Sequence, residues 1–204
     1  GSEMCIRDRG LGAVGFYDDY RKLDSGGKDT FKAKPKMLLI LFTIVPVAYL
    51  LHQYTGNQSI HFPFLKAEYA LELWAPLYLA FGVIVIVGSC NAVNLTDGLD
   101  GLAAGCSLMA ILAFLPWTYV TGHKIMAQYL HIPYMPDVQE LTVFLCALGG
   151  AVLGFLWYNC HPAQIFMGDT GSLAIGGSLG FVAMATMQEI LLFIAGGVFV
   201  AEAM

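Results

Sequence analysis

The stretch LELWAPLYLAFGVIVIVGSCNAV, residues 71–93, decides the fold class of this chain. A helix needs roughly 17 to 25 mostly apolar residues to cross the hydrocarbon core of a membrane, and this run is long enough. Residues 101–121 and 141–158 form two further runs of this kind, and shorter ones lie at 37–51, 173–187 and 190–203. The sequence therefore predicts an all-α, polytopic transmembrane helical bundle with about six spans. The last two runs form either a tight hairpin at Gln188-Glu189 or one long tilted helix.

The composition agrees with a membrane protein and excludes most soluble classes. Hydrophobic residues make up 57% of the chain, charged residues 12%, and the mean hydropathy is +0.66; all three depart from soluble-domain averages toward membrane proteins. The net charge of -5 says little about partners, and nothing in the sequence indicates nucleic acid. The five cysteines show no CxxC or metal-binding spacing, so packed thiols in contact with apolar neighbours and membrane lipids are expected.

Both ends of the chain look incomplete. Residues 1–10, GSEMCIRDRG, are polar and continue no later pattern, which is typical of a non-native scar segment. The last residues, 201–204, follow directly on an apolar run. We therefore expect residues 11–204 to form a partial transmembrane domain, an internal fragment of a longer protein that lacks both ends.

Basic residues set the expected orientation. Six of them crowd the segment before the first span: Arg21, Lys22, Lys28, Lys32, Lys34 and Lys36. The positive-inside bias makes this segment cytoplasmic. Counting spans from there places all three acidic motifs of the chain on the cytoplasmic face, although they lie far apart in sequence.

The first acidic motif is FYDDYRK, residues 16–22, which contains Asp18 and Asp19. An isolated pair of this kind is often only the solvated end of a helix. Adjacent carboxylates also repel each other, which favours a bound cation or a raised pKa on one of them.

The second acidic motif is NAVNLTDGLDG, residues 91–101. Asn94, Thr96 or Asp97 alone would be explained as a helix cap. Capping does not require four Asn and Asp side chains, however, and Asp97 and Asp100 are spaced to share one helix face. This spacing allows both carboxylates to point at one target.

The third acidic motif is NCHPAQIFMGDTGS, residues 159–172. Glycines on both sides of Asp169 let the backbone bend closely around a ligand, and the following helix start offers free N–H groups to an anion. Asp169 beside such a seat implies a divalent cation that bridges carboxylate and phosphate. Phe166 is either a packing aromatic or a base-stacking one, and His161 is interpreted as a loop-fixing residue.

The three acidic motifs together resemble those of the phospho-N-acetylmuramoyl-pentapeptide transferases, within the polyprenyl-phosphate N-acetylhexosamine-1-phosphate transferase superfamily. The resemblance covers residues 11–204. It implies a Mg²⁺-dependent glycosyl-1-phosphate transferase of the bacterial cytoplasmic (inner) membrane, with its active site on the cytoplasmic face. The implied reaction moves phospho-N-acetylmuramoyl-pentapeptide from UDP to undecaprenyl phosphate and yields lipid I and UMP for peptidoglycan synthesis.

The resemblance also implies roles for individual residues. The catalytic carboxylates would be Asp18, Asp19 and Asp169, with Asp169 as the magnesium ligand. The substrate-binding residues would be Lys22 and Lys34 near phosphate, and Asn91, Asn94, Asp97, Asp100, Asn159 and Phe166 on the nucleotide side. Further N-terminal helices and a C-terminal three-histidine loop belong to the family pattern and are absent from this sequence. The resemblance thus implies an incomplete, inactive fragment, and it leaves a homodimer open.

Two other functions fit parts of the sequence. A transferase that uses UDP-N-acetylglucosamine belongs to the same superfamily, but its relatives usually show Asp-Ala-Gly-Ser where this chain has Asp-Thr-Gly-Ser at 169–172. A cation-coupled transporter would place acidic residues within spans near the midplane, often in paired repeats. Here the aspartates lie at the ends of the apolar runs, and no repeat is visible.

Overall fold

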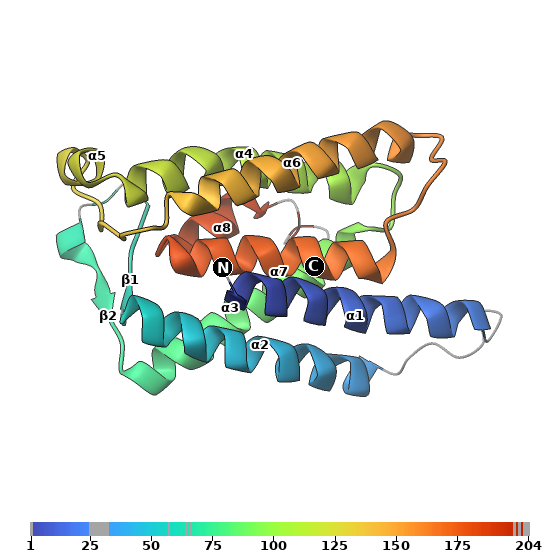
Figure 1. Ribbon diagram of the computed structural model, residues 1–204, viewed down its shortest axis with the longest axis horizontal. Helices are drawn as coiled ribbons and strands as arrows, with labels where there is room; N and C mark the ends of the chain where they lie inside the picture. The colour runs from blue at the N-terminus through green and yellow to red at the C-terminus, as the bar shows by residue number, and fades with distance from the viewer. Residues whose placement is uncertain are drawn as a thin grey trace.

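The structure is a computed structural model that describes residues 2–24, 33–56, 58–63, 65, 67–197, 199 and 201. These residues are almost entirely helical (Figure 1). The helices are α1 (Ser2–Asp24), α2 (Ala33–Thr55), α3 (Ala75–Thr96), α4 (Leu102–Gly122), α5 (Lys124–Tyr129), α6 (Glu140–Asn159), α7 (Gly168–Ala185) and α8 (Glu189–Ala195). Between α2 and α3, the short strands β1 (Ser59–Ile60) and β2 (Leu71–Glu72) pair antiparallel, with a 3-10 turn at Ala67–Tyr69. The prediction of an all-α bundle is confirmed.

The predicted number of spans was too high for the part of the chain described. By length and composition, four of these helices can cross a membrane: α2, α3, α4 and α6. The first span is also longer than the predicted 37–51, because α2 continues through polar residues at both of its ends. α7 is not among the four: Gly, Ser and Thr fill much of its first turns, and it begins at Gly168, before the apolar run at 173–187.

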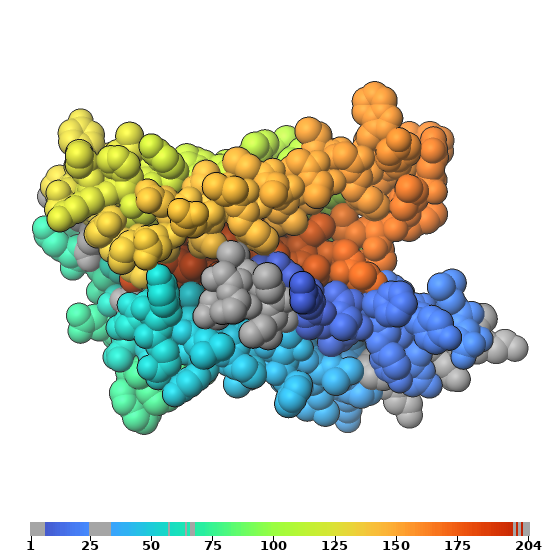
Figure 2. All heavy atoms as spheres, viewed as in Figure 1, coloured from blue at the N-terminus to red at the C-terminus, as the bar shows by residue number. Residues whose placement is uncertain are grey.

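α7 lies at the centre of the bundle. In Figure 1 it runs between a layer of α4 and α6 and a layer of α1 and α2, and it also packs along α3. Every residue from Ile175 to Ala185 is buried, so this helix contacts protein on all sides. Figure 2 shows only part of its surface between the two layers.

Glycines permit the closest of these contacts. A Cβ atom on Gly176 would lie 2.5 Å from the backbone oxygen of Ser89, and one on Gly180 would lie 2.8 Å from the Cα atom of Ile86. The backbones of α3 and α7 therefore touch, as small residues allow in membrane helix pairs.

Large apolar side chains point outward from the spanning helices. Phe42 is 80% exposed, Ile84 and Met109 are each 67% exposed, and Val143 is 70% exposed. Leaving such side chains in water costs roughly 1.5 to 3 kcal/mol each, a cost that surrounding lipid removes. With the four apolar helices, they define a multi-pass membrane protein.

The bundle has two distinct ends. The C-terminal end of α1, the start of α7 and the loop between α6 and α7 lie at one end, and the β1–β2 hairpin and α5 lie at the other (Figure 1). The prediction that the three acidic motifs lie on one side of the bundle is confirmed. The side of the membrane that they face stays a prediction, as does the non-native origin of residues 1–10, through which α1 extends from Ser2.

Candidate active site

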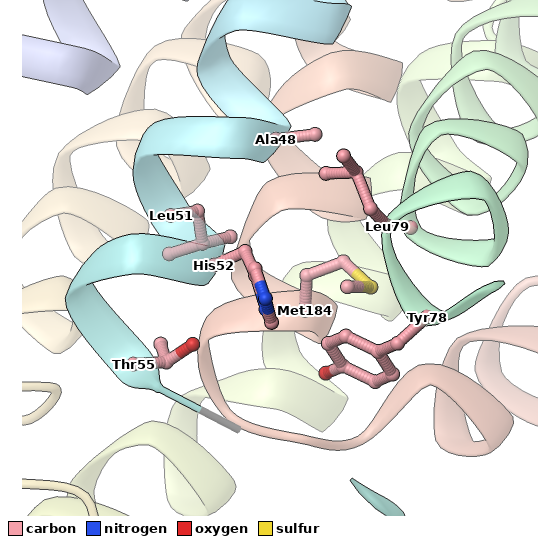
Figure 3. Close-up of a pocket in the computed structure, with 8 residues that line it drawn as sticks. Ala48, Leu51, His52, Thr55, Tyr78, Leu79 and Met184 are labelled. Carbon is pink, nitrogen blue, oxygen red and sulfur yellow. The ribbon is translucent and has the colours of Figure 1, made fainter. Parts of the chain in front are cut away.

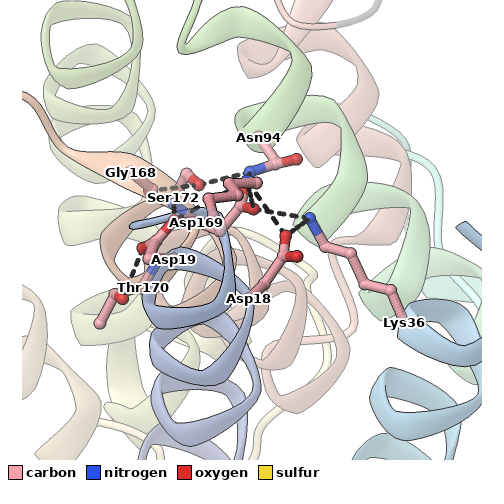
Figure 4. A network of polar contacts seen from close by, with 9 residues as sticks. Asp18, Asp19, Lys36, Asn94, Gly168, Asp169, Thr170 and Ser172 are labelled. Atoms are coloured by element: carbon pink, nitrogen blue, oxygen red, sulfur yellow. Dashed lines mark hydrogen bonds and ion pairs between the residues drawn. The ribbon is translucent and has the colours of Figure 1, made fainter. Parts of the chain in front are cut away.

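The carboxylate of Asp169, in the first turn of α7, is the centre of a polar cluster (Figure 4). It receives hydrogen bonds from Lys22 of α1 and from the side-chain amide of Asn94 of α3, and its Oδ2 lies 3.0 Å from Nζ of Lys36 in α2. The Asn94 amide also donates to Oγ of Ser172 at 2.8 Å. Four helices thus meet at this carboxylate.

Asp18 faces the same two ammonium groups. Its Oδ2 lies 3.1 Å from Nζ of Lys22 and 3.2 Å from Nζ of Lys36. The residue is only 2% exposed, and its Oδ1 has no hydrogen-bond partner among the residues that the structure describes. A buried carboxylate oxygen without a partner is costly, so Asp18 has an unused site for a cation or a donor.

Asp19 points elsewhere, toward the backbone at the start of α7. Its Oδ1 accepts the Asp169 N–H at 3.2 Å, and its Oδ2 accepts the Thr170 N–H at 3.0 Å and the Thr170 hydroxyl at 2.7 Å. The two adjacent aspartates therefore have different partners.

The protonation of the cluster follows from these contacts. Burial opposes charge on Lys22, but hydrogen bonds and attraction from Asp169 and Asp18 outweigh it and raise the pKa of Lys22. Burial also disfavours charge on Asp169, yet its polar partners hold the pKa of that carboxyl well below its usual range. The lysine is therefore a cation, and Asp169 an anion, at neutral pH.

Asp97 behaves differently. Its pKa rises to about 6, chiefly through burial; the Gly168 backbone N–H opposes this rise, and the charges of Asp169 and Asp19 add to it. Asp97 thus lies within the field of the cluster, and its carboxyl binds a proton closer to neutral pH than an ordinary aspartate does.

Two residues predicted on the nucleotide side hold the loop between α6 and α7. Asn159 is 3% exposed; its Oδ1 accepts the Gly101 N–H at 3.1 Å, and its Nδ2 donates to the Ile165 carbonyl at 2.8 Å. Oδ2 of Asp100 accepts the Ala163 N–H at 3.2 Å and lies 3.2 Å from Nδ1 of His161. The interpretation of His161 as a loop-fixing residue agrees with this contact.

Three other predicted site residues have no contact with Asp169 in the structure described. The amide of Asn91 donates within its own helix to the Val87 carbonyl at 2.9 Å. Phe166 is 74% exposed, and Lys34 is exposed at the start of α2. Their substrate roles stay predictions.

Lys36 is the site residue that sequence reasoning missed, and helix phase is the signal that identifies it. Lys36 shares a face of α2 with Ile40 and Ile44, which are both fully buried. Lys34 shares a face with Leu38 and Phe42, which are 66% and 80% exposed. Periodicity therefore separates the inward lysine from the outward one.

The carboxylates fit a magnesium ion only in part. Among the described residues, no group of three His, Cys, Asp or Glu side chains could hold a metal. Mg²⁺, however, is usually bound by one or two carboxylates together with substrate phosphates. Asp169 and Asp18 flank the same ammonium groups, and the unpartnered oxygen of Asp18 adds a free ligand, so this pair fits such a mode.

A second polar feature lies at the opposite end of the bundle. A small pocket lies between α2, α3 and α7, and Figure 3 shows His52, Tyr78 and Met184 around it. The Tyr78 hydroxyl donates at 2.9 Å to Oε1 of Glu189, a fully buried residue at the start of α8. Oε2 of Glu189 has no partner in the structure.

The fold and the site together define a multi-pass membrane protein with an acidic, lysine-lined centre at one end of its helices. The chain belongs to glycosyl transferase family 4, whose family model matches residues 8–187.

Curated relatives extend this likeness. The chain is 47% identical over 195 residues to the phospho-N-acetylmuramoyl-pentapeptide-transferase of Desulfotalea psychrophila, a match that covers 95% of this chain and 54% of the relative. Proteins of the same name are 46% identical in Methylacidiphilum infernorum, over 95% of this chain, and 45% identical in Leptospira biflexa, over 93% of it. In each case the chain spans 54% of the relative's length.

Proposed function

We propose that the protein acts in the transfer of phospho-N-acetylmuramoyl-pentapeptide from UDP to undecaprenyl phosphate, which forms lipid I and UMP. The printed names of the relatives support the choice of the transferred group, phospho-N-acetylmuramoyl-pentapeptide. One observation carries the proposal. At the end of the bundle where α1, α2 and α7 converge, two carboxylates and two ammonium groups meet: Asp169, Asp18, Lys22 and Lys36. Phosphoryl transfer requires charge neutralisation and positioning, and these residues supply both.

In the proposed reaction, an oxygen of undecaprenyl phosphate attacks the phosphorus that is bonded to the sugar. A new P–O bond forms there, and the P–O bond to UMP breaks. The ammonium groups of Lys22 and Lys36 neutralise phosphate oxygens during this exchange. Asp18 orients the attacking phosphate; proton removal is of modest value, because a phosphate monoester with a second pKa near 6 is mostly dianionic at neutral pH.

Magnesium is part of the proposal. Asp169 and Asp18 would hold it, and when bound it would offset the negative charge of the diphosphate. The amide of Asn94 fixes the Asp169 carboxylate from the side, as partners of metal ligands commonly do.

The test is a transfer assay in detergent. UMP release and lipid I formation are measured with undecaprenyl phosphate and either UDP-N-acetylmuramoyl-pentapeptide or UDP-N-acetylglucosamine. The assay uses residues 1–204 and a version extended to the relatives' full length; we expect only the extended version to turn over, because positioning groups of the longer proteins are then complete. Turnover that requires the muramoyl donor supports the proposal, and a preference for UDP-N-acetylglucosamine contradicts it.

We further propose that this site faces the cytoplasm across the bacterial inner membrane. The basic residues near the start of the first span support this orientation. Among the described ones, Arg21 and Lys22 lie in the last turn of α1, and Lys34 and Lys36 lie in the first turn of α2.

A further inference from the structure

The start of α7 lacks a cap of its own. The first N–H groups of any helix have no partner within the helix, and a side chain just before the helix usually accepts from them. The N-cap residue of α7 is Met167, whose side chain makes no such bond. Asp19, which comes from α1, accepts the N–H groups of Asp169 and Thr170 in its place (Figure 4).

These bonds are of a strong kind. A carboxylate that accepts backbone N–H groups forms charge-assisted hydrogen bonds, and its negative charge is favourable at the positive end of the helix dipole. The Thr170 hydroxyl adds a third donor at 2.7 Å. Both oxygens of Asp19 are thus used by the α7 backbone and Thr170, whereas the nearest ammonium among the described residues, Nζ of Lys22, lies 3.8 Å from Asp19 Oδ1.

The surrounding backbone is shaped for this contact. A Cβ atom on Gly15, one turn before Asp19, would lie 2.4 Å from the backbone oxygen of Asp169. Gly168 has a positive φ of 65°, and a Cβ there would lie 2.8 Å from Oδ2 of Asp19. Because both glycines lack a Cβ atom, α1 can lie close to the first turn of α7.

Helix geometry explains why the neighbours Asp18 and Asp19 act differently. Successive residues of an α-helix point roughly 100° apart, because a turn has 3.6 residues. Asp18 therefore points at Lys22 and Lys36, while Asp19 points at the backbone of α7.

We propose that Asp19 is a positioning residue that caps α7 from α1 and so fixes the Asp169 carboxylate, and that Asp18 alone of the pair faces the reacting groups. The catalytic consequence rests on the proposed function, but the cap itself does not. Small displacements of a catalytic group can lower a rate about 100-fold, so the cap matters for turnover.

The first experiment measures amide hydrogen exchange at Asp169 and Thr170 in the purified protein. Asp19→Ala should speed exchange there roughly tenfold, the scale of a lost helix cap, while Asp18→Asn should leave it unchanged. Thr170→Val removes one donor without removing a charge, so it should speed exchange less than Asp19→Ala does. Thr170→Ser keeps the hydroxyl and should leave the exchange rate unchanged. Equal exchange in wild type and Asp19→Ala would overturn the cap; if Asp19→Ala does not fold, Thr170→Val against Thr170→Ser decides the same point.

The second experiment measures kcat and KM in the extended protein that carries the proposed activity. Asp19→Asn and Thr170→Val should both lower kcat with little change in KM for either substrate, and their double variant should be less than additive because they share one bond. If Thr170→Val kept the wild-type kcat while Asp19→Asn had no measurable activity, Asp19 would act on the reactants directly. Absence of transfer with either UDP-sugar contradicts the proposed function, and the exchange result then still decides the cap.

Discussion

Nζ of Lys36 lies 3.0 Å from Oδ2 of Asp169, which joins the start of α2 to the start of α7. The same nitrogen lies 3.2 Å from Oδ2 of Asp18 on α1. One ammonium group therefore holds together three helices that converge at the proposed site. Without it, two partly buried carboxylates would face each other with less compensation.

Loss of this ammonium should be severe. We expect Lys36→Met to lower kcat/KM for UMP release roughly 100-fold, as removal of one charge-stabilising group commonly does. Lys36→Arg should recover part of the activity. Lys124→Met, at the opposite end of the bundle on α5, is the matched control and should behave as wild type. Wild-type kcat/KM in Lys36→Met would refute a role for Lys36 in turnover.

Asp169→Asn should abolish magnesium-dependent turnover, with a loss of about 100-fold or more, while the protein stays folded. The amide keeps the shape of the carboxylate but loses the charge that binds a hard cation and attracts Lys22 and Lys36. The assay is a magnesium titration of UMP release, with thermal unfolding as the folding control. Near wild-type activity of this variant at low magnesium would exclude Asp169 as the ligand.

The α3–α7 contact should tolerate no side chain at Gly176. Gly176→Ala places a Cβ atom against the Ser89 backbone and should lower the free energy of unfolding by about 1 to 3 kcal/mol. Gly150→Ala in α6 is the control, because a Cβ there meets nothing within 4 Å and alanine favours a helix. Unfolding in detergent measures both. If the free energy of unfolding of Gly176→Ala equalled that of the wild type, α3 and α7 would be less closely packed than the structure shows.

Glu189 should make stability depend on pH. Burial raises its pKa from 4.5 to about 7, and the Tyr78 hydroxyl opposes the rise. A carboxyl with a higher pKa in the folded state favours folding when protonated, so the contribution of Glu189 to stability should be greatest below about pH 4.5 and fall as the pH rises through 7.

Glu189→Gln should remove this fall, which amounts to roughly 3 kcal/mol at most. Unfolding of the two proteins is compared at several pH values in detergent. Parallel curves for wild type and Glu189→Gln would show that Glu189 does not titrate in this range.

The proposed orientation can be tested with single cysteines on a cysteine-free background. An impermeant thiol reagent applied to intact cells should label Lys124→Cys, but should reach Gly98→Cys and Thr170→Cys only after permeabilisation. Position 28 suits the same test, although it lies outside the described residues. Ready labelling of Gly98→Cys in intact cells would reverse the orientation.

Apolar runs alone predicted the spanning helices well, because membrane spans must be both long and apolar, but they did not predict the polar helix α1. The run at 71–93 became α3 with shifted ends: Leu71 and Glu72 belong to β2, and the helix begins at Ala75, so that Pro76 lies in its first turn, where a proline is tolerated. The span count failed at α7, whose small polar residues serve close helix contacts and are poorly represented by hydropathy. Parity of spans correctly predicted that Asp18, Asp97 and Asp169 would lie at one end.

The finer arrangement of the site could not be predicted from spacing. Six basic residues precede or begin α2, and their composition does not distinguish Lys36 from Lys34; the phase of the buried face does. The different directions of Asp18 and Asp19 depend on where α7 meets α1, which is a tertiary contact. Asn159 is of a residue type that is common in binding sites, but both polar atoms of its side chain form hydrogen bonds with the backbone of neighbouring loops.

Because α7 is enclosed by other helices along most of its length, we expect it to stay in place while the reaction proceeds at its first turn. Accommodation of two bulky substrates would then fall on the segments around it, 97–101 and 160–167, whose contacts include the hydrogen bonds of Asp100 and Asn159. Compounds that wedge these segments apart would block the reaction without touching a carboxylate. Substitutions that confer resistance to such compounds should therefore lie in these two loop segments and not in α7.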